Sequence, residues 1–275
     1  MKETLELRIN YDYAHLLFKE DEGINIGTSV KVIKLSKEDP RYCQVPIISE
    51  EVKKKFGRSF FFGWQIKRKY SKKELDMASL LHLKIRAVFE PTGEECGTVY
   101  NEAVACEICG ANRKQVSPLK LKKGTIPKKD IAQTIGGEVI VSEKFVNAVR
   151  QRNLKGIQLS SINVEDYYQL TAITEIELSP DIVVGINPFD LSTIDQGEIY
   201  RCPKGDTIGL NLLSEPYLLS SLSIGEFDFF ASREKIGVKR GLLRPEPIYF
   251  CSRAFRKMIK EENLSGFEFE ISNIE

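Results

Sequence analysis

The sequence predicts an α+β protein made of two related strand–helix–strand halves, and three observations lead to this prediction. Residues 139–159 align without a gap with residues 249–269. Outside these stretches, apolar residues alternate with polar ones as they do in half-buried strands. A cysteine-rich loop precedes the first half. We therefore expect an N-terminal strand-rich segment, the cysteine cluster with the first half, and the second half, over residues 1–93, 94–165 and 166–275.

The N-terminal segment is expected to contain mostly strands. Leu5–Tyr13 alternates between apolar and polar residues, and Val30–Ile33 and Phe60–Ile66 are further runs of strand length. Ser71-Lys72-Lys73-Glu74 has the pattern of a capping box, in which the serine and the glutamate bond the first backbone N–H groups of a helix. One helix should therefore follow Ser71, and His82–Phe89 predicts another strand.

Residues 53–73 combine nine basic with six aromatic residues and contain no acid. Proteins that bind single-stranded nucleic acid use this combination, and the contacts would come from Trp64, Lys67, Arg68 and Lys69. The alternative is a strand with aromatic residues in the core and solvated lysines, which we favour because Phe60–Phe62 is strongly apolar. Alternation then places one of two sets in the core: Phe60, Phe62 and Trp64, or Phe61, Gly63 and Gln65.

The stretch Glu94–Gly110 contains three of the six cysteines. Cys106-x-x-Cys109 can present two sulfurs to one metal ion from a single tight turn. The glycine that follows Cys109 allows the backbone to turn so that N–H groups point at sulfur. Cys96 is also followed by glycine, so we take it as a third candidate ligand of a structural zinc in a loop of the zinc-ribbon kind.

A tetrahedral zinc needs a fourth ligand from elsewhere in the chain. Cys202 is the best candidate because it also begins a turn with proline and glycine, and His82 is the alternative. Two other interpretations compete with zinc: ordinary buried thiols and a redox-active pair. The additional Cys-Gly upstream favours the metal over buried thiols, and no thioredoxin-like strand–motif–helix pattern supports the redox pair.

The two matched stretches each predict a strand, a helix and a second strand. A serine precedes each helix and is expected to cap it. Apolar residues at i, i+3 and i+4 form one buried stripe, and the following Asn and Gly can adopt left-handed conformations that end the helix. Identical residues occupy Ser142/Ser252, Phe145/Phe255, Asn153/Asn263, Leu154/Leu264 and Gly156/Gly266. All of these have roles in folding, so the repeat indicates two similar halves and no catalytic site.

The bulk composition is that of an ordinary globular protein. The chain has 275 residues, 42% of them hydrophobic, and a net charge of +1, so no global field selects nucleic acid or an anionic membrane. The first residues contain no apolar run and no window approaches about 20 apolar residues, so we expect neither a signal peptide nor a membrane span. We expect a cytoplasmic protein whose cysteines bind metal rather than form disulfides.

A Cys-Gly turn followed by a strand–helix–strand unit ending in Leu-x-Gly, with a second such unit downstream, resembles the double-CXXCG-motif proteins. These are bacterial immunity proteins of contact-dependent and polymorphic toxin systems. The similarity covers roughly the last two-thirds of the chain and depends on Cys106–Gly110 and Val141–Leu159. In that family each half carries Cys-x-x-Cys-Gly, whereas here the second motif is reduced to Cys202-Pro203-Lys204-Gly205. One site formed by Cys96, Cys106, Cys109 and Cys202 would replace the two.

The resemblance implies a non-catalytic protein that binds and neutralises a toxin, with a structural zinc site. The sequence itself does not favour an enzyme, because neither His15 nor His82 lies in a catalytic motif and no phosphate-binding loop occurs. Two alternatives stay open. One is a nucleic-acid-binding protein that uses Lys53–Lys73, and the other is an enzyme whose carboxylates converge only in the fold.

Overall fold

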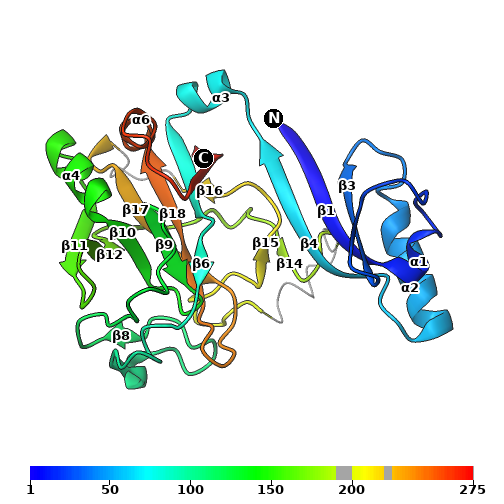
Figure 1. Cartoon of the computed structure of the whole chain (residues 1–275), viewed down its shortest axis with the longest axis horizontal. Helices are drawn as coiled ribbons and strands as arrows, with labels where there is room; N and C mark the ends of the chain where they lie inside the picture. The colour runs from blue at the N-terminus through cyan, green and yellow to red at the C-terminus, as the bar shows by residue number, and fades with distance from the viewer. Residues whose placement is uncertain (190–199, 220–224, 275) are drawn as a thin grey trace. The chain divides into compact units, whose positions relative to one another are not determined.

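The protein has the α+β fold class that the sequence predicts (Figure 1). The computed structural model describes residues 1–189, 200–219 and 225–274. These form two compact units. The first comprises Met1–Ser71 with the described residues Asn187–Phe189, and the second comprises the rest of the described chain. The first unit thus ends before the helix that the capping box predicts.

The first unit is an antiparallel four-stranded sheet of order β2-β3-β1-β4 with helices α1 and α2 on one face. Leu5, Leu7 and Ile9 of the central strand are buried, which confirms the predicted alternation. Helix α2 was not predicted, because its apolar stripe is narrow and its start contains Pro46. The elements are β1 (Lys2–Asn10), α1 (Tyr11–Ala14), β2 (Ile24–Ile26), β3 (Val30–Ser36), α2 (Gln44–Phe56) and β4 (Phe61–Lys69).

The aromatic residues of β4 follow neither of the two predicted alternations completely. Phe60 is fully buried, Phe61 and Trp64 pack against the core, and Phe62 is 56% exposed. The cause is an irregularity in the pairing of β4 with β1, where Gly63 pairs with Arg8 but Phe61 pairs with Ile9. The extra residue turns Phe62 outwards and returns Phe61 to the core side.

The second unit contains two larger sheets. Their strand orders are β11-β12-β10-β9-β6 and β13-β17-β18-β5-β19-β16. Their strands are β5 (Leu80–Ile85), β6 (Val88–Phe89), β9 (Ile131–Thr134), β10 (Val139–Ser142), β11 (Ile157–Ser161), β12 (Tyr167–Ala172), β13 (Glu175–Ile176), β16 (Tyr217–Leu218), β17 (Phe229–Ile236), β18 (Glu246–Ser252) and β19 (Phe267–Ile274). The helices are α3 (Lys72–Met77), α4 (Glu143–Arg152) and α6 (Arg253–Glu261). Two short pairs join β7 (Tyr100–Asn101) to β8 (Lys114–Gln115) and β14 (Val184–Gly185) to β15 (Asn211–Leu212).

Both helices of the matched stretches begin where the sequence predicts. The hydroxyl of Ser142 accepts a hydrogen bond from the backbone N–H of Phe145 at 3.2 Å, and that of Ser252 from Phe255 at 3.1 Å. The two phenylalanines are fully buried with ring centroids 5.9 Å apart. Figure 1 shows α4 and α6 at one end of the second unit and β8 at the opposite end.

An aspartate before each of the two helices links one matched stretch to the other. Asp130 accepts hydrogen bonds from the hydroxyl of Ser142 at 2.8 Å and from the backbone N–H of Ser265, in the other stretch, at 2.7 Å. Asp228 does the same for the second helix: it accepts hydrogen bonds from the hydroxyl of Ser252 at 2.6 Å and from the backbone N–H of Lys155, in the first stretch, at 3.0 Å. Each carboxylate therefore fixes the helix start of its own stretch and the helix exit of the other.

The glycine that follows each helix lies against the strand that precedes the other matched stretch, β17 or β9. Gly156 has φ +88° and lies so close to the carbonyl of Phe229 that a Cβ atom would come within 2.3 Å of it. Gly266 has φ +98° and the corresponding distance to the carbonyl of Ile131 is 2.5 Å. Only glycine satisfies both the backbone conformation and the close approach, which explains why both stretches carry it.

Candidate metal centre

The first cysteine turn spans Cys106–Ala111. The backbone N–H of Cys106 donates to the carbonyl of Ala111 and that of Gly110 donates to the carbonyl of Cys106, both at 2.8 Å. Gly110 has φ +72°, and a Cβ atom there would lie 2.5 Å from the side chain of Lys239. The turn therefore needs glycine directly after Cys109, as the sequence motif suggested.

The second cysteine turn follows the same plan. The backbone N–H of Cys202 donates to the carbonyl of Thr207 at 3.0 Å, and that of Gly205, with φ +80°, donates to the carbonyl of Cys202 at 2.8 Å. The N–H of Lys235 in β17 donates to the carbonyl of Asp206 at 2.8 Å. The turn is thereby attached to the six-stranded sheet.

The two turns bring four potential ligands together. The side chains of Cys106, Cys109, Cys202 and Asp206 have ligand atoms within 4.8 Å of one another, close enough to hold a metal ion. The sulfurs of Cys106 and Cys202 are 3.6 Å apart, and the sulfur of Cys202 is 3.5 Å from Oδ2 of Asp206. Two thiolates on a tetrahedral zinc, each about 2.3 Å from the ion, would be about 3.8 Å apart. The donor atoms therefore fit such a site.

Two of the three thiols in the cluster have shifted pKa values. Burial raises the pKa of Cys109 to about 11. Burial also acts to raise the pKa of Cys202, but hydrogen bonds from the backbone N–H groups of Lys204 and Asp206 outweigh it and the pKa is lowered. The second turn thus favours thiolate, the form of cysteine that binds metal, whereas Cys109 would need the ion itself to stabilise its charge.

Asp206 is the ligand candidate that the sequence analysis missed. Its second carboxylate oxygen accepts a hydrogen bond from the side chain of Asn112 at 2.6 Å, so it joins the second turn to the end of the first. Asn112 has φ +65°, a conformation that asparagine tolerates better than most residues. The sequence feature that could have indicated Asp206 as a ligand is its position four residues after Cys202, directly after the glycine of the same turn.

Cys96, which the sequence analysis assigned to the site, is not part of the cluster. It lies in a separate turn, where its backbone N–H donates to the carbonyls of Thr92 and Gly93 at 3.2 and 3.1 Å. The hydroxyl of Thr98 accepts a hydrogen bond from the N–H of Lys120 at 2.8 Å, which attaches this turn to the chain leading to β9. Both Cys-Gly pairs, Cys96-Gly97 and Cys109-Gly110, therefore form turns, but only the turn that contains Cys109 faces Cys202.

His82, the alternative fourth ligand, is also outside the cluster. It lies in β5, where its Nδ1 is 3.7 Å from the carboxylate of Glu270 in β19. Burial acts to raise the pKa of Glu270, but His82 and Lys84 outweigh it and lower the pKa to about 2. His82 therefore belongs to a buried ion-pair group within the six-stranded sheet.

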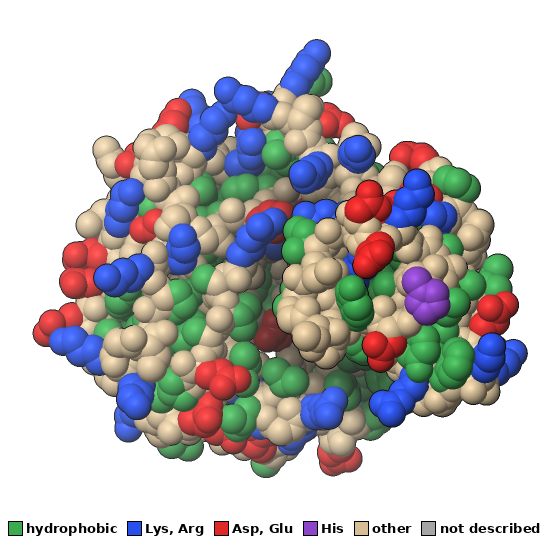
Figure 2. Space-filling view, turned by 45° about the vertical axis from the view of Figure 1, so that its right-hand side comes forward, with side chains coloured by type: hydrophobic (Ala, Val, Ile, Leu, Met, Phe, Trp, Pro, Cys, Tyr) green, Lys and Arg blue, Asp and Glu red, His purple; other side chains and the backbone are tan. Residues whose placement is uncertain are grey.

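The candidate nucleic-acid residues of β4 have different surroundings. Arg68 is buried and paired with Glu3 at 2.7 Å, Lys67 is paired with Glu6 at 2.6 Å, and Trp64 packs on the core. Lys69 is exposed, as are Lys53–Lys55. Figure 2 shows basic and acidic side chains interspersed over the face in view. Three of the four candidates are thus engaged within the first unit.

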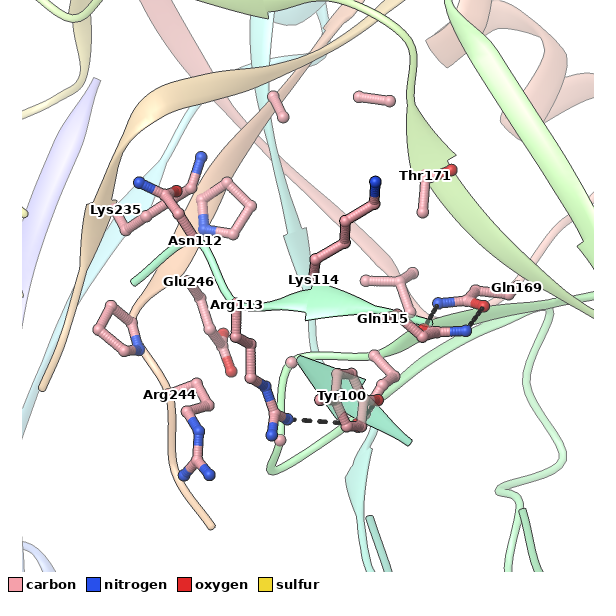
Figure 3. Close-up of a pocket in the computed structure, with 18 of the residues that line it drawn as sticks. Tyr100, Asn112, Arg113, Lys114, Gln115, Gln169, Thr171, Lys235, Arg244 and Glu246 are labelled. Carbon is pink, nitrogen blue, oxygen red and sulfur yellow. Dashed lines mark hydrogen bonds and ion pairs between the residues drawn. The ribbon is translucent and has the colours of Figure 1, made fainter. Parts of the chain in front are cut away.

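Charged side chains surround the first cysteine turn. The guanidinium of Arg113 contacts Glu94 at 2.7 Å and Glu102 at 3.1 Å, and stacks on Tyr100 at 3.7 Å (Figure 3). Arg244 contacts Glu94 as well, at 3.2 Å. Glu94 therefore joins the loop before the cluster to the segment that leads into β18.

Comparison with models of known protein families gave no match, and comparison with curated protein sequences gave none either. Among the described residues, the helices are all too short or too polar to cross a membrane.

Proposed function

We propose that Cys106, Cys109, Cys202 and Asp206 bind a structural zinc ion. Three soft thiolates and one carboxylate suit zinc better than magnesium or calcium, which prefer oxygen ligands. The fit of the 3.6 Å sulfur separation to a tetrahedral site supports this choice. Four protein ligands would leave no open position for a substrate, so the ion would have a structural role.

The ion would cross-link parts of the chain that lie far apart in sequence. Cys106 and Cys202 are separated by 96 residues. The first belongs to the loop between β7 and β8, and the second to the turn attached to β17. Closing such a long loop with a metal stabilises the folded chain because the unfolded chain loses the corresponding freedom.

We further propose that the chain is a non-catalytic bacterial binding protein of the immunity type, whose partner is a cognate toxin. The observation that carries this proposal is the meeting of the complete Cys-x-x-Cys-Gly turn with the reduced Cys-x-x-Gly turn. In the resembling family each half carries the full motif. Here Asp206, directly after Gly205, provides the ligand that the missing cysteine would otherwise supply.

The metal and the partner need separate tests. Elemental analysis of protein purified without chelator should give about one zinc per chain, as expected for one four-ligand site. A metal content near zero would refute the zinc proposal. For the partner, the protein should be isolated from its source cell and the bound proteins identified by mass spectrometry. Co-expression with the bound protein should then rescue growth, and a partner whose toxicity is unaffected would refute the immunity proposal.

A further inference from the structure

A cavity of about 600 Å³ lies beside the metal centre within the second unit. Its walls come from the cysteine-rich loop, from β12 and from β17 and β18. Gly110 and Asn112, which belong to or follow the first cysteine turn, line it as well. Figure 3 shows Arg113, Arg244 and Glu246 entering from one side and Gln169 and Thr171 from the other. Its volume is in the range of sites that bind small molecules or side chains, about 300–1,000 Å³.

Glu246 is the exceptional group in this wall. Its Oε2 accepts a hydrogen bond from the side chain of Gln133 at 2.7 Å, while Oε1 lies close to Gly137 with no donor among the described residues. No ion pair to Glu246 occurs in the described part of the chain. Burial and the nearby charge of Glu138 raise the pKa of Glu246 to about 7. The carboxyl group is therefore held in the wall without a compensating cation.

The other charged groups of the wall already have partners, with one exception. Arg113 and Arg244 bind the same carboxylates, Glu94 and Glu102. Lys235 contacts Glu175 at 3.0 Å. Glu138 accepts hydrogen bonds from Tyr100 and Thr134, and its carboxylate lies 3.7 Å from the guanidinium of Arg113. The exception is Lys114, an exposed residue whose ammonium can stay in solvent. Within the described wall, Glu246 is thus the one acid that still lacks a cation.

We propose that this cavity binds an alkylguanidinium or alkylammonium group, with Glu246 as its anchor. A cation at this position would supply the missing donor to Oε1 and the missing positive charge, a charge-assisted hydrogen bond in a partly desolvated site. The alkyl part would contact the apolar wall, which includes Pro245, Pro247 and Ala231. The group can belong to a free amine or to an arginine or lysine side chain of a protein partner. The site does not depend on which metal occupies the cysteine cluster.

The test compares two ligands of nearly equal shape on the wild-type protein. Butylguanidinium and butylurea differ in charge, so calorimetric titration at pH 8 should detect binding of the first and at least tenfold weaker binding of the second. Equal binding, or none at millimolar concentration, would overturn the proposal without any variant. Arginine with blocked ends should bind like butylguanidinium if a partner's side chain fits, whereas rejection of it would assign the site to free amines.

A matched pair of variants assigns the binding to Glu246. Glu246→Gln removes the charge and keeps a hydrogen bond to Gln133, and it should weaken butylguanidinium binding at least tenfold. Glu175→Gln makes the same change at a wall residue that already has a partner, and it should leave the dissociation constant within twofold. Equal losses in both variants would contradict Glu246 as the anchor. The zinc content of both should match that of wild type, so this result can fail independently of the metal proposal.

Discussion

The two ends of the second unit are stabilised in different ways. At the helical end, Phe145 and Phe255 are fully buried and pack against each other. At the opposite end, the cysteine-rich loop exposes much of its apolar surface, with Val99, Val104 and Ile108 each more than half exposed. Ion pairs and the cysteine cluster replace apolar burial there. The helical end is thus held by apolar burial that its own sequence pattern specifies, whereas the other end brings together four side chains that are close enough to hold a metal ion.

The largest expected effect comes from damage to the helical end. Phe255→Ala should lower the free energy of unfolding by about 3–5 kcal/mol, because it leaves a cavity at the centre of the core. Denaturant unfolding measures the loss, and the zinc content of the folded fraction should stay unchanged. Loss of the metal together with the phenyl ring would mean that the two ends are not separately stabilised.

A substitution in the cysteine cluster should lower the free energy of unfolding nearly as much, but its structural effect should stay local. Cys106→Ser should abolish stoichiometric zinc and lower the free energy of unfolding by at least about 3 kcal/mol, a part of the 10–16 kcal/mol that zinc contributes in finger peptides. Limited proteolysis should then cut within residues 94–115 first. Cys96→Ser is the control and should retain zinc, since Cys96 lies outside the cluster. A loss of zinc in Cys96→Ser would return that residue to the site.

The acid in the cavity wall should make stability depend on pH. The pKa of Glu246 is about 7 in the folded protein against an ordinary 4.5, so the folded state binds more protons between these values. Stability should therefore fall as pH rises from about 4.5 to 7, by an amount on the order of 3 kcal/mol. Glu246→Gln should be more stable than wild type at pH 8 and similar to it below pH 4.5. Parallel stability curves for the two proteins would contradict the raised pKa.

The smallest expected effect concerns the helix caps. Ser142→Ala should cost about 1 kcal/mol, because it removes the hydrogen bond to the N–H of Phe145. Ser252→Ala should cost a similar amount, since Ser252 makes the equivalent bonds to Phe255 and Asp228. Chemical denaturation of the two variants measures both values. A difference above about 1 kcal/mol between them would show that the two matched stretches do not contribute equally.

Some features of this protein were determined by the sequence over short distances. The hydroxyls of Ser142 and Ser252 cap the helices that follow them, and the glycine after Cys109 makes the turn that its motif requires. Alternation in β1 buried Leu5, Leu7 and Ile9. These outcomes depend on neighbours within a few residues, where backbone geometry and side-chain type are sufficient.

The tertiary structure alone decided which distant groups meet. Cys96 and Cys106 both lie in glycine-containing turns, yet only Cys106 faces Cys202. The turn of Cys96 is instead bonded to the segment at Lys120. Asp206 became a ligand candidate because β17 holds its turn against the first one. Glu246 became a candidate cation anchor because segments far apart in sequence enclose it in a cavity wall, where no described basic side chain forms an ion pair with it. Side chains that are far apart in sequence come into contact only when the sheets assemble. No local sequence pattern could therefore predict these sites.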